Sequence, residues 1–342
     1  MRTALAVETG INLKPYNTFG LPCVAQTLVR IRSEADVKRV VDDPELGPAR
    51  KFILGGGSNL VLTQDLKVAV LKVEIPGIRL LETRDDAWIV EAGAGVAWHT
   101  LVSWCLDHDL PGLENMALIP GTVGAAPVQN IGAYGLELKD RFESLDAVDL
   151  MTGRTVTFHR EQCHFDYRDS IFKQALAGRS VITTVRLRLP RPWTPVLGYA
   201  ELERKVAETG ITAPSARQIF DWIVAVRRAK LPDPAVIGNA GSFFKNPVVT
   251  PEQCRDIIQR DPEIVHYPMP DGNFKLAAGW MIDACGWKGK SVGQAGVYEK
   301  QALVLVNRGD ARGAEVVTLA RAIQESVYGR FGIRLEPEPV VI

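Results

Sequence analysis

Cysteine is scarce in this chain and forms no pairing pattern. The 342 residues include five widely spaced cysteines, an odd number, and no C-x-x-C is present. This spacing argues against both a disulfide framework and a zinc site. His99 and His108 also lack neighbours at metal-ligand spacing. We therefore expect free, buried thiols, no metal and a reducing compartment.

Net charge and long apolar runs are missing as well. Forty basic residues balance forty acidic ones, so the formal net charge is zero and no strong basic field exists to hold nucleic acid or an anionic membrane. No segment reaches the roughly 18 apolar residues of a membrane span, and Met1–Gly10 does not have the pattern of a signal peptide. We expect a cytoplasmic monomer without nucleic-acid or membrane partners.

The pattern of apolar residues predicts a mixed α+β protein. The length favours two or three domains, with a boundary within about 190–214 at a proline-rich stretch. Helices are expected at 33–41, 98–108, 215–230, from 250, 276–285 and 311–331, and strands at 51–54, 60–62, 68–73, 88–91, 144–150, 155–158, 180–189 and 302–307.

Two glycine-rich runs suggest an anion site. Gly55–Asn59 lies between two predicted strands, so it lacks the following helix of a dinucleotide fingerprint. It either makes a tight hairpin turn or holds phosphate with consecutive backbone N–H groups. Pro120–Gly135 is too apolar for a linker, and its backbone polar groups need partners. Together the two runs could clasp a pyrophosphate.

Three polar residues stand in unusual surroundings. Ser242 is the only hydroxyl in Gly238–Pro247, and is either a proton donor or a turn residue before a strand. Arg168 could clamp a carboxylate or form a surface ion pair. Glu338 lies among prolines and apolar residues near the end of the sequence, in a frayed tail or in one that carries a carboxylate into a cleft.

Together these runs resemble the UDP-N-acetylenolpyruvoylglucosamine reductases, the flavoenzymes that make UDP-N-acetylmuramate for bacterial peptidoglycan. The resemblance spans nearly the whole chain in the family's order. It rests on N-T-F-G (17–20), G-G-G-S-N (55–59), P-G-T-V-G-A-A-P-V-Q-N-I-G-A-Y-G (120–135), Y-R-D-S-I-F-K (167–173), K-L-P-D-P (230–234), G-N-A-G-S-F-F-K-N-P (238–247), A-A-G-W-M-I-D-A-C (277–285), Q-A-L-V-L-V-N (301–307) and L-E-P-E (335–338).

The resemblance implies a particular α+β architecture. An FAD-binding unit of the vanillyl-alcohol-oxidase (PCMH) type would comprise subdomains 1–66 and 67–200. A C-terminal substrate-binding lobe would span 215–330, and a tail, 331–342, would return to the active site. Gly198-Tyr199 looks like the loop that distinguishes the longer, first branch of the family.

The resemblance also implies the reaction: NADPH reduces non-covalently bound FAD, hydride passes from flavin N5 to C3 of UDP-N-acetylglucosamine enolpyruvate, and Ser242 gives a proton to C2. Because serine is a weak acid, Ser242 would need Lys230, Lys245 or a water chain. Arg168 and a protonated Glu338 would stabilise the developing charge. The implied catalytic residues are Arg168, Ser242 and Glu338. The implied flavin contacts are Gly55, Gly56, Gly57, Ser58, Asn59, Pro120, Gly121, Thr122, Gly124, Ala125, Ile131 and Gly132. The implied substrate contacts are Tyr134, Tyr199, Lys230, Asn246, Tyr267 and Gln301.

The chain departs from the family pattern at two places. Thr122 stands where serine is common, and Pro339-Val340 replaces the usual Val-Arg after the glutamate. We nevertheless expect residues 335–342 to be ordered, with the apolar residues anchoring a short strand. The alternatives are another flavin-dependent oxidase on the same scaffold and a non-catalytic nucleotide-sugar binding protein.

Overall fold

The computed structural model describes residues 5–342, so the first four residues of the predicted subdomain 1–66 lie outside it. The chain forms two compact units. Unit 1 contains Val24–Gly57 and Leu66–Ala229 together with the N-terminal residues up to Ile11. Unit 2 contains Asn12–Cys23, Ser58–Asp65 and Lys230–Ile342. Two short segments from the N-terminal part thus belong to the C-terminal unit. The predicted division into three subdomains and a tail stays a prediction.

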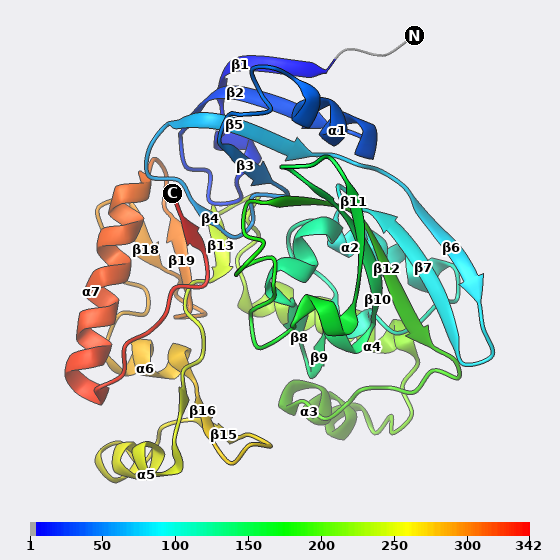
Figure 1. The fold of residues 1–342 in the computed structure, drawn as a ribbon. Coiled ribbons are helices and arrows are strands. Elements are labelled where there is room, and N and C mark those ends of the chain that lie inside the picture. Colours follow the sequence, from blue (N-terminus) through cyan, green and yellow to red (C-terminus); the bar gives the residue numbers. More distant parts are fainter. Residues whose placement is uncertain (1–4) are drawn as a thin grey trace. The chain divides into compact units, whose positions relative to one another are not determined.

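A four-stranded sheet opens unit 1, in the order β1-β2-β5-β3. Its strands are β1 (Ala6–Asn12), β2 (Val24–Ile31), β3 (Lys51–Leu54) and β5 (Leu66–Val73). The pairs β2–β5 and β3–β5 are parallel. Helix α1 (Glu34–Asp42) packs beside this sheet (Figure 1) through Val37 and Val40. Its first turn is capped by Ser33, whose hydroxyl accepts the Asp36 N–H.

An antiparallel five-stranded sheet forms the larger part of unit 1, in the order β11-β10-β12-β7-β6. The strands are β6 (Ile78–Thr83), β7 (Ala87–Gly93), β10 (Phe142–Asp149), β11 (Thr155–His159) and β12 (Ser180–Pro190). Leu145, Val185 and Leu187 face a buried core. Alternate residues carry polar side chains, as expected when only one face of a sheet is apolar.

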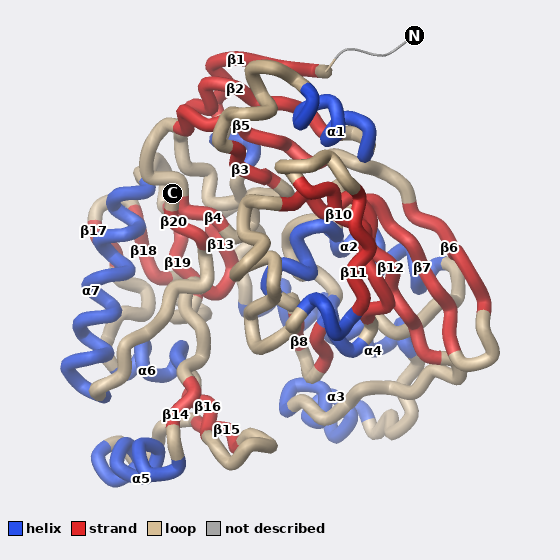
Figure 2. Tube along the Cα trace, in the orientation of Figure 1, coloured by secondary structure: helices blue, strands red, loops and turns tan. Residues whose placement is uncertain are grey.

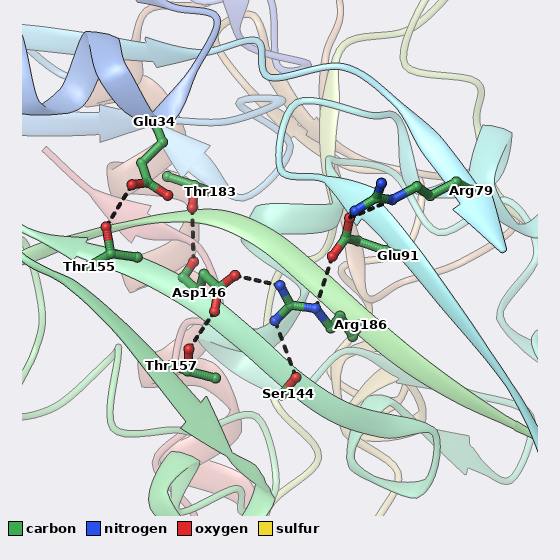
Figure 3. Close-up of polar contacts among 9 residues, drawn as sticks. All are labelled: Glu34, Arg79, Glu91, Ser144, Asp146, Thr155, Thr157, Thr183 and Arg186. Atoms are coloured by element: carbon green, nitrogen blue, oxygen red, sulfur yellow. Dashed lines mark hydrogen bonds and ion pairs between the residues drawn. The ribbon is translucent and has the colours of Figure 1, made fainter. Parts of the chain in front are cut away.

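The polar side chains form a chain of contacts across all five strands, which we call the cross-strand network (Figure 3). It joins Thr157 of β11, Asp146 of β10, Arg186 of β12, Glu91 of β7 and Arg79 of β6. Arg186 contacts Asp146 at 2.5 Å and Glu91 at 2.9 Å. Every charged group of the network thus has an opposite charge beside it.

Helices α2 (Trp98–Asp107), α3 (Ala200–Thr209) and α4 (Ala216–Lys230) contribute to the apolar core of unit 1 (Figure 2). The predicted capping of α4 by Ser215 is confirmed, since its hydroxyl accepts the Gln218 N–H. Helix α3 is absent from the sequence-based prediction. Only Leu202 of this helix is buried, so the apolar periodicity that reveals a helix is nearly missing there.

Unit 2 is built on a second antiparallel sheet, β13-β19-β18-β17. Its strands are β13 (Asn239–Ser242), β17 (Ser291–Val292), β18 (Ala295–Val297) and β19 (Val304–Asn307). Helices α6 (Ala278–Ala284) and α7 (Gly313–Phe331) contribute Met281, Ile282 and Ile323 to its core. In Figure 1, α7 lies along β18 and β19. Helix α6 begins two residues after the predicted start at 276, because Phe274–Leu276 forms strand β16.

The remaining elements of unit 2 are small. Strands β14 (Val248–Val249), β15 (His266–Pro268) and β16 form a three-stranded sheet beside helix α5 (Pro251–Arg260). The predicted start of α5 is confirmed, because Thr250 and Gln253 form a capping box. The tail also ends in a strand, β20 (Val340–Val341), which pairs in parallel with β4 (Leu60–Val61).

Short 3₁₀ helices and one small ribbon complete the chain. The 3₁₀ helices are Lys14–Tyr16, Glu114–Met116, Val123–Gln129, Leu138–Asp140 and Arg160–Cys163, and the ribbon is β8 (Gly132–Ala133) with β9 (Leu136–Glu137). All five cysteines are free, four of them buried and Cys285 half-buried. Among residues 5–342, no helix has the length and apolar character needed to cross a bilayer.

Candidate functional site

The two glycine-rich runs meet in unit 1, as predicted. A Cβ atom on Gly56 would lie 2.9 Å from Cα of Gly121, and one on Gly55 would lie 2.8 Å from Oγ1 of Thr122. Only glycine permits so close an approach of two backbones. Gly57 and Gly121 also have φ angles of +63° and +107°, which L side chains rarely adopt. We call Gly55–Gly57 with Gly121–Gly124 the glycine clasp.

The strand pairing around the clasp excludes the hairpin reading of Gly55–Asn59. Strand β3, before the glycines, pairs with β5 in unit 1. Strand β4, after them, pairs with β20 in unit 2. The glycines therefore connect strands of different sheets, and the hairpin alternative is wrong.

The clasp contains a buried hydroxyl without a partner. Oγ1 of Thr122 is buried and makes no hydrogen bond to the described residues. Leaving such a group unpaired costs roughly 1–3 kcal/mol, so the arrangement fits a ligand with hydrogen-bonding atoms. The narrow backbone cradle and this hydroxyl suit the pyrophosphate of a dinucleotide such as FAD. Thr122, Gly55 and Gly56 are the residues that would hold it.

Arg168 lies close to the second glycine run. Its Nη2 donates to the carbonyl of Gly132 at 3.1 Å, so the structure brings this predicted catalytic residue to a predicted flavin contact. Arg168 has φ +55° in a turn closed by mutual backbone hydrogen bonds of Asp166 and Asp169. Asn130, with φ +43°, donates from Nδ2 to the carbonyl of Asp166. Such strained residues cluster at functional sites when the surrounding structure holds them in place.

Tyr134 and Tyr199, two predicted substrate contacts, also come together. Their rings are 5.2 Å apart in an edge arrangement. Tyr199 precedes the first residue of α3 and is exposed, whereas Tyr134 is half-buried with φ +49°. Burial raises the pKa of the Tyr134 phenol, and the guanidinium of Arg227, to which it is hydrogen-bonded, partly opposes that rise. Helix α3 therefore places Tyr199 next to Tyr134.

Arg227 and Asn115 were missed by the sequence analysis. Nε of Arg227 and Oδ1 of Asn115 are buried and without hydrogen-bond partners among the described residues. Both side chains contact Tyr134: Arg227 through its phenol, Asn115 through a 2.8 Å bond to its carbonyl. Arg227 also donates to the carbonyl of Leu118. The only signal in the sequence was an arginine on an amphipathic helix that carries three of them, which is too common to single out.

In unit 2, Ser242 ends strand β13. It pairs with Val304 of β19 across an irregularity that contains Gly241, whose φ is +71°. Ser242 is exposed, while Phe243 and Phe244 are buried directly behind it. Its turn-residue alternative is wrong, because Gly241 and Ser242 both lie within the strand. Lys245, one of its expected proton suppliers, instead pairs with Glu336 at 3.0 Å.

The C-terminal tail is ordered and lies beside the Ser242 segment. The Glu338 N–H donates to the carbonyl of Phe243 at 2.8 Å, and Lys245 N–H donates to the carbonyl of Glu336. Asn59, a predicted flavin contact, donates from Nδ2 to the Glu338 carbonyl at 3.2 Å and accepts from the Val340 N–H. The expectation of an ordered tail with a short strand is confirmed, and the frayed-tail alternative is wrong.

The N-T-F-G run supports the same segment. Thr18 and Asn239 exchange two hydrogen bonds, from the Thr18 hydroxyl at 2.7 Å and from the Asn239 N–H at 3.0 Å. Asn307 donates from Nδ2 to the carbonyl of Phe19. A Cβ on Gly238 would lie 2.2 Å from that carbonyl. This explains why Asn12–Cys23 belongs to unit 2, and it gives the motif a structural role.

The other predicted substrate contacts are spread over unit 2. Lys230 is the last residue of α4. Asn246 accepts the Ala278 N–H at the start of α6, and Gln301 accepts the Leu303 N–H in the loop before β19. Tyr267 is exposed on β15. Asn246 and Gln301 therefore have structural partners in addition to their predicted roles. No group of three or more metal-ligating side chains is found in residues 5–342.

Comparison with known proteins identifies the family. Residues 233–342 match the family model of the UDP-N-acetylenolpyruvoylglucosamine reductase C-terminal domain, and residues 25–159 match that of an FAD binding domain. The UDP-N-acetylenolpyruvoylglucosamine reductase of Azoarcus sp. (strain BH72) is 56% identical over 342 residues, covering 99% of this chain and 98% of that protein. The chain belongs to this reductase family. The enzyme of the same name from Burkholderia cenocepacia (strain HI2424) is 54% identical with the same coverage.

A solved structure supports the fold. The crystal structure of UDP-N-acetylenolpyruvylglucosamine reductase from Thermus caldophilus superposes with a TM-score of 0.68 at 24% identity, covering 99% of each chain. The predicted α+β class, with an FAD-binding unit of the vanillyl-alcohol-oxidase type and a C-terminal lobe, is confirmed. The FAD-binding match includes the whole clasp, so its unpartnered Thr122 hydroxyl and backbone cradle lie in the part of the chain that binds FAD.

Proposed function

We propose that this chain is a UDP-N-acetylmuramate dehydrogenase: it reduces UDP-N-acetylglucosamine enolpyruvate to UDP-N-acetylmuramate with NADPH and bound FAD. The observation that carries the proposal is the fixed backbone of Glu338, hydrogen-bonded to Phe243 next to Ser242 and to Asn59. A glutamate whose backbone is fixed next to the segment of an exposed serine is an arrangement that a passive binding protein does not need. We place the reaction in the bacterial cytoplasm, where the five free thiols would persist, and keep a monomer as the simplest assembly.

Bound FAD would supply hydride transfer from NADPH to C3 of the enolpyruvyl group, and the glycine clasp would hold its pyrophosphate. In the clasp, backbone N–H groups and the Thr122 hydroxyl are the available donors. Because Gly56 and Gly121 are nearly in contact, the two loops hold each other in one arrangement before the cofactor binds. Preorganised donors of this kind lose little entropy on binding.

Arg168 stabilises the charge that develops when C3 accepts hydride. Negative charge then spreads from C2 over the neighbouring carboxylate, and a guanidinium can donate two parallel hydrogen bonds to such a group. The 3.1 Å bond to the carbonyl of Gly132 and the tight turn around φ +55° hold the side chain at the flavin-binding run.

Ser242 donates the proton that completes the product at C2. Its hydroxyl is exposed at the end of β13, and the two buried phenylalanines after it fix the backbone. Lys245 is engaged by Glu336. We therefore assign the resupply of the proton to Lys230 or to a water chain.

Glu338 assists the same step as a hydrogen-bond donor to the substrate carboxylate. The residue is half-buried, and a carboxylic acid donates a hydrogen bond only in its neutral form. We assign substrate binding to Tyr134, Tyr199, Lys230, Asn246, Tyr267 and Gln301.

Stopped-flow absorbance on the two half-reactions tests the function. Purified protein should be yellow, and NADPH should bleach the flavin band, which the enolpyruvyl sugar nucleotide then restores. Ser242→Ala should leave bleaching unchanged and slow the second step by about 10²–10⁴-fold, the usual cost of losing a general acid. Ser291→Ala, an exposed serine in the same sheet, is the control. Equal slowing of both steps would remove Ser242 from the mechanism, and binding without turnover in the wild type would favour a binding protein.

A pair of substitutions tests the tail. Glu338→Gln should keep part of the activity, because an amide still donates a hydrogen bond, whereas Glu338→Ala should lose nearly all of it. Equal activity in the two variants, or full activity after deletion of the last five residues, would overturn the role of Glu338.

A further inference from the structure

Lys72 is a half-buried cation at the edge of the glycine clasp, and no role above uses it. It is the next-to-last residue of β5 and lies opposite Leu54, the last residue of β3, in the parallel pair. Its ammonium group donates to the carbonyl oxygen of Gly55 at 2.5 Å. The contact therefore falls on the first peptide of the clasp.

This contact fixes the direction of a backbone N–H group. The carbonyl of Gly55 and the N–H of Gly56 belong to one planar trans peptide and point to opposite sides of it. When Lys72 holds the carbonyl on one side, the Gly56 N–H must point to the other. A hydrogen bond to the carbonyl also polarises the peptide, which makes its N–H a better donor. Glycine has no side chain to restrain this peptide in any other way.

The charge of Lys72 is available to the clasp. Lys72 has no ion-pair partner in the part of the chain that the structure describes, and the nearby Glu74 pairs with Arg30 at 2.7 Å and Arg32 at 3.6 Å. Burial lowers the pKa of Lys72, a shift that the charge of Glu74 partly opposes. A half-buried ammonium group without a carboxylate partner is stabilised when an anion binds nearby.

We propose that Lys72 is a positioning residue for the cofactor: it orients the Gly55–Gly56 peptide toward the FAD pyrophosphate and supplies a positive charge behind it. The inference rests on the proposed FAD-dependent function. It adds to that function a residue that contributes to binding the pyrophosphate of FAD. Lys72 does not contribute to binding the flavin ring.

Lys51 offers a matched control at the other end of β3. Its ammonium group donates to the carbonyls of Gly47 and Ala49 at 2.7 and 2.9 Å. Burial lowers its pKa as well. It therefore makes the same kind of lysine-to-backbone contact in the same sheet, but on a loop outside the clasp.

The experiment compares two ligands that share a flavin ring. Full-length wild type, Lys72→Met and Lys51→Met are freed of flavin, and the dissociation constants of FAD and riboflavin are measured by flavin fluorescence. Lys72→Met should weaken FAD binding by about 10-fold, the effect of one charge-assisted hydrogen bond, and leave riboflavin binding unchanged. It should also reduce the dependence of FAD affinity on salt. Lys51→Met should change neither ligand, and Lys72→Arg should restore most of the FAD affinity.

The outcomes separate this inference from the proposed function. Failure of the wild type to bind FAD would overturn both. Tight wild-type binding together with FAD affinity within twofold in Lys72→Met would overturn the role of Lys72 alone. Equal losses of FAD and riboflavin affinity would show a general structural role and also overturn it. If Lys72→Met does not fold, Lys72→Gln, which keeps a donor but no charge, replaces it under the same criteria.

Discussion

Two polar regions of unit 1 differ in one decisive respect. In the cross-strand network, every charged side chain has its partner within the protein, and the contacts run unbroken over five strands (Figure 3). In the clasp and beside Tyr134, by contrast, buried polar atoms of Thr122, Asn115 and Arg227 have no partner among the described residues. Such atoms are rare in folded proteins, and a bound ligand is one explanation for them.

This difference distinguishes polar groups that stabilise the fold from polar groups that bind a ligand. Satisfied groups contribute to folding and gain nothing from a ligand, whereas unsatisfied ones cost stability in the free protein and recover it on binding. Substitutions in the clasp should therefore change cofactor affinity more than folding. Substitutions in the network should do the reverse.

The largest expected effect comes from adding a side chain between the two loops of the clasp. Gly56→Val would place side-chain atoms against the Gly121 backbone, where even a Cβ lies at 2.9 Å. Forcing the loops apart should weaken FAD binding by about 100-fold or more, since overpacking typically costs 1–3 kcal/mol and the donors also lose their positions. The protein should purify colourless, and titration with FAD measures the loss. Gly329→Val, at an exposed helix position with nothing within 4 Å, is the control. A folded Gly56→Val protein with stoichiometric flavin would show that the loops are only turns.

A smaller effect is expected at Thr122, where FAD affinity and thermal stability should respond differently. Thr122→Val keeps the shape of the side chain and removes the unpartnered hydroxyl. The flavin-free protein should unfold at the same or a higher temperature, while FAD affinity should fall by about 10-fold, as for one lost hydrogen bond. Ser180→Ala removes another buried, unpartnered hydroxyl, at the start of β12 outside the clasp. It should share the stability effect and leave FAD affinity unchanged. Unchanged FAD affinity in Thr122→Val would mean that the hydroxyl does not serve the cofactor.

Sequence patterns predicted the parts of this fold that depend on local signals. Helices α1 and α5 begin at the capping residues Ser33 and Thr250, and strands such as β12 follow from alternating apolar residues. Helix α3 could not be predicted because tertiary context stabilises a segment with one buried residue. The pairing of β4 with β20 joins residues 280 positions apart, such as Leu60 and Val340, and no local signal encodes such a contact.

The candidate site shows the same division. Glycine runs revealed the clasp because close backbone approach restricts residue type. The meeting of Gly56 with Gly121 was expected, and the structure shows it. Arg227 and Lys72 were not predicted, because burial and the absence of a counter-charge are properties of the fold. From sequence alone, a lysine in a strand is predicted to be an exposed edge residue.

The smallest expected effect concerns the cross-strand network, through Asp146. Burial alone would raise the pKa of this carboxyl, but hydrogen bonds from Arg186 and Thr157 and the charge of Arg186 bring it below its ordinary value. A carboxyl whose pKa is lower in the folded state stabilises the protein above its unfolded-state pKa, and that contribution is lost as the pH falls through the folded-state value.

Asp146→Asn should therefore lower the free energy of unfolding by about 1 kcal/mol near pH 7, since both partners are mostly buried yet Arg186 keeps Glu91. The difference from the wild type should shrink as the pH is lowered below 4, because protonation then removes the same charge from the wild-type side chain. Urea unfolding at several pH values measures both. Asp107→Asn, which removes an exposed carboxylate paired with Arg217, should leave the curve unchanged, and FAD affinity should not move in either variant. A loss of FAD affinity in Asp146→Asn would break the distinction between the two regions, because it would tie a fully paired network to the cofactor.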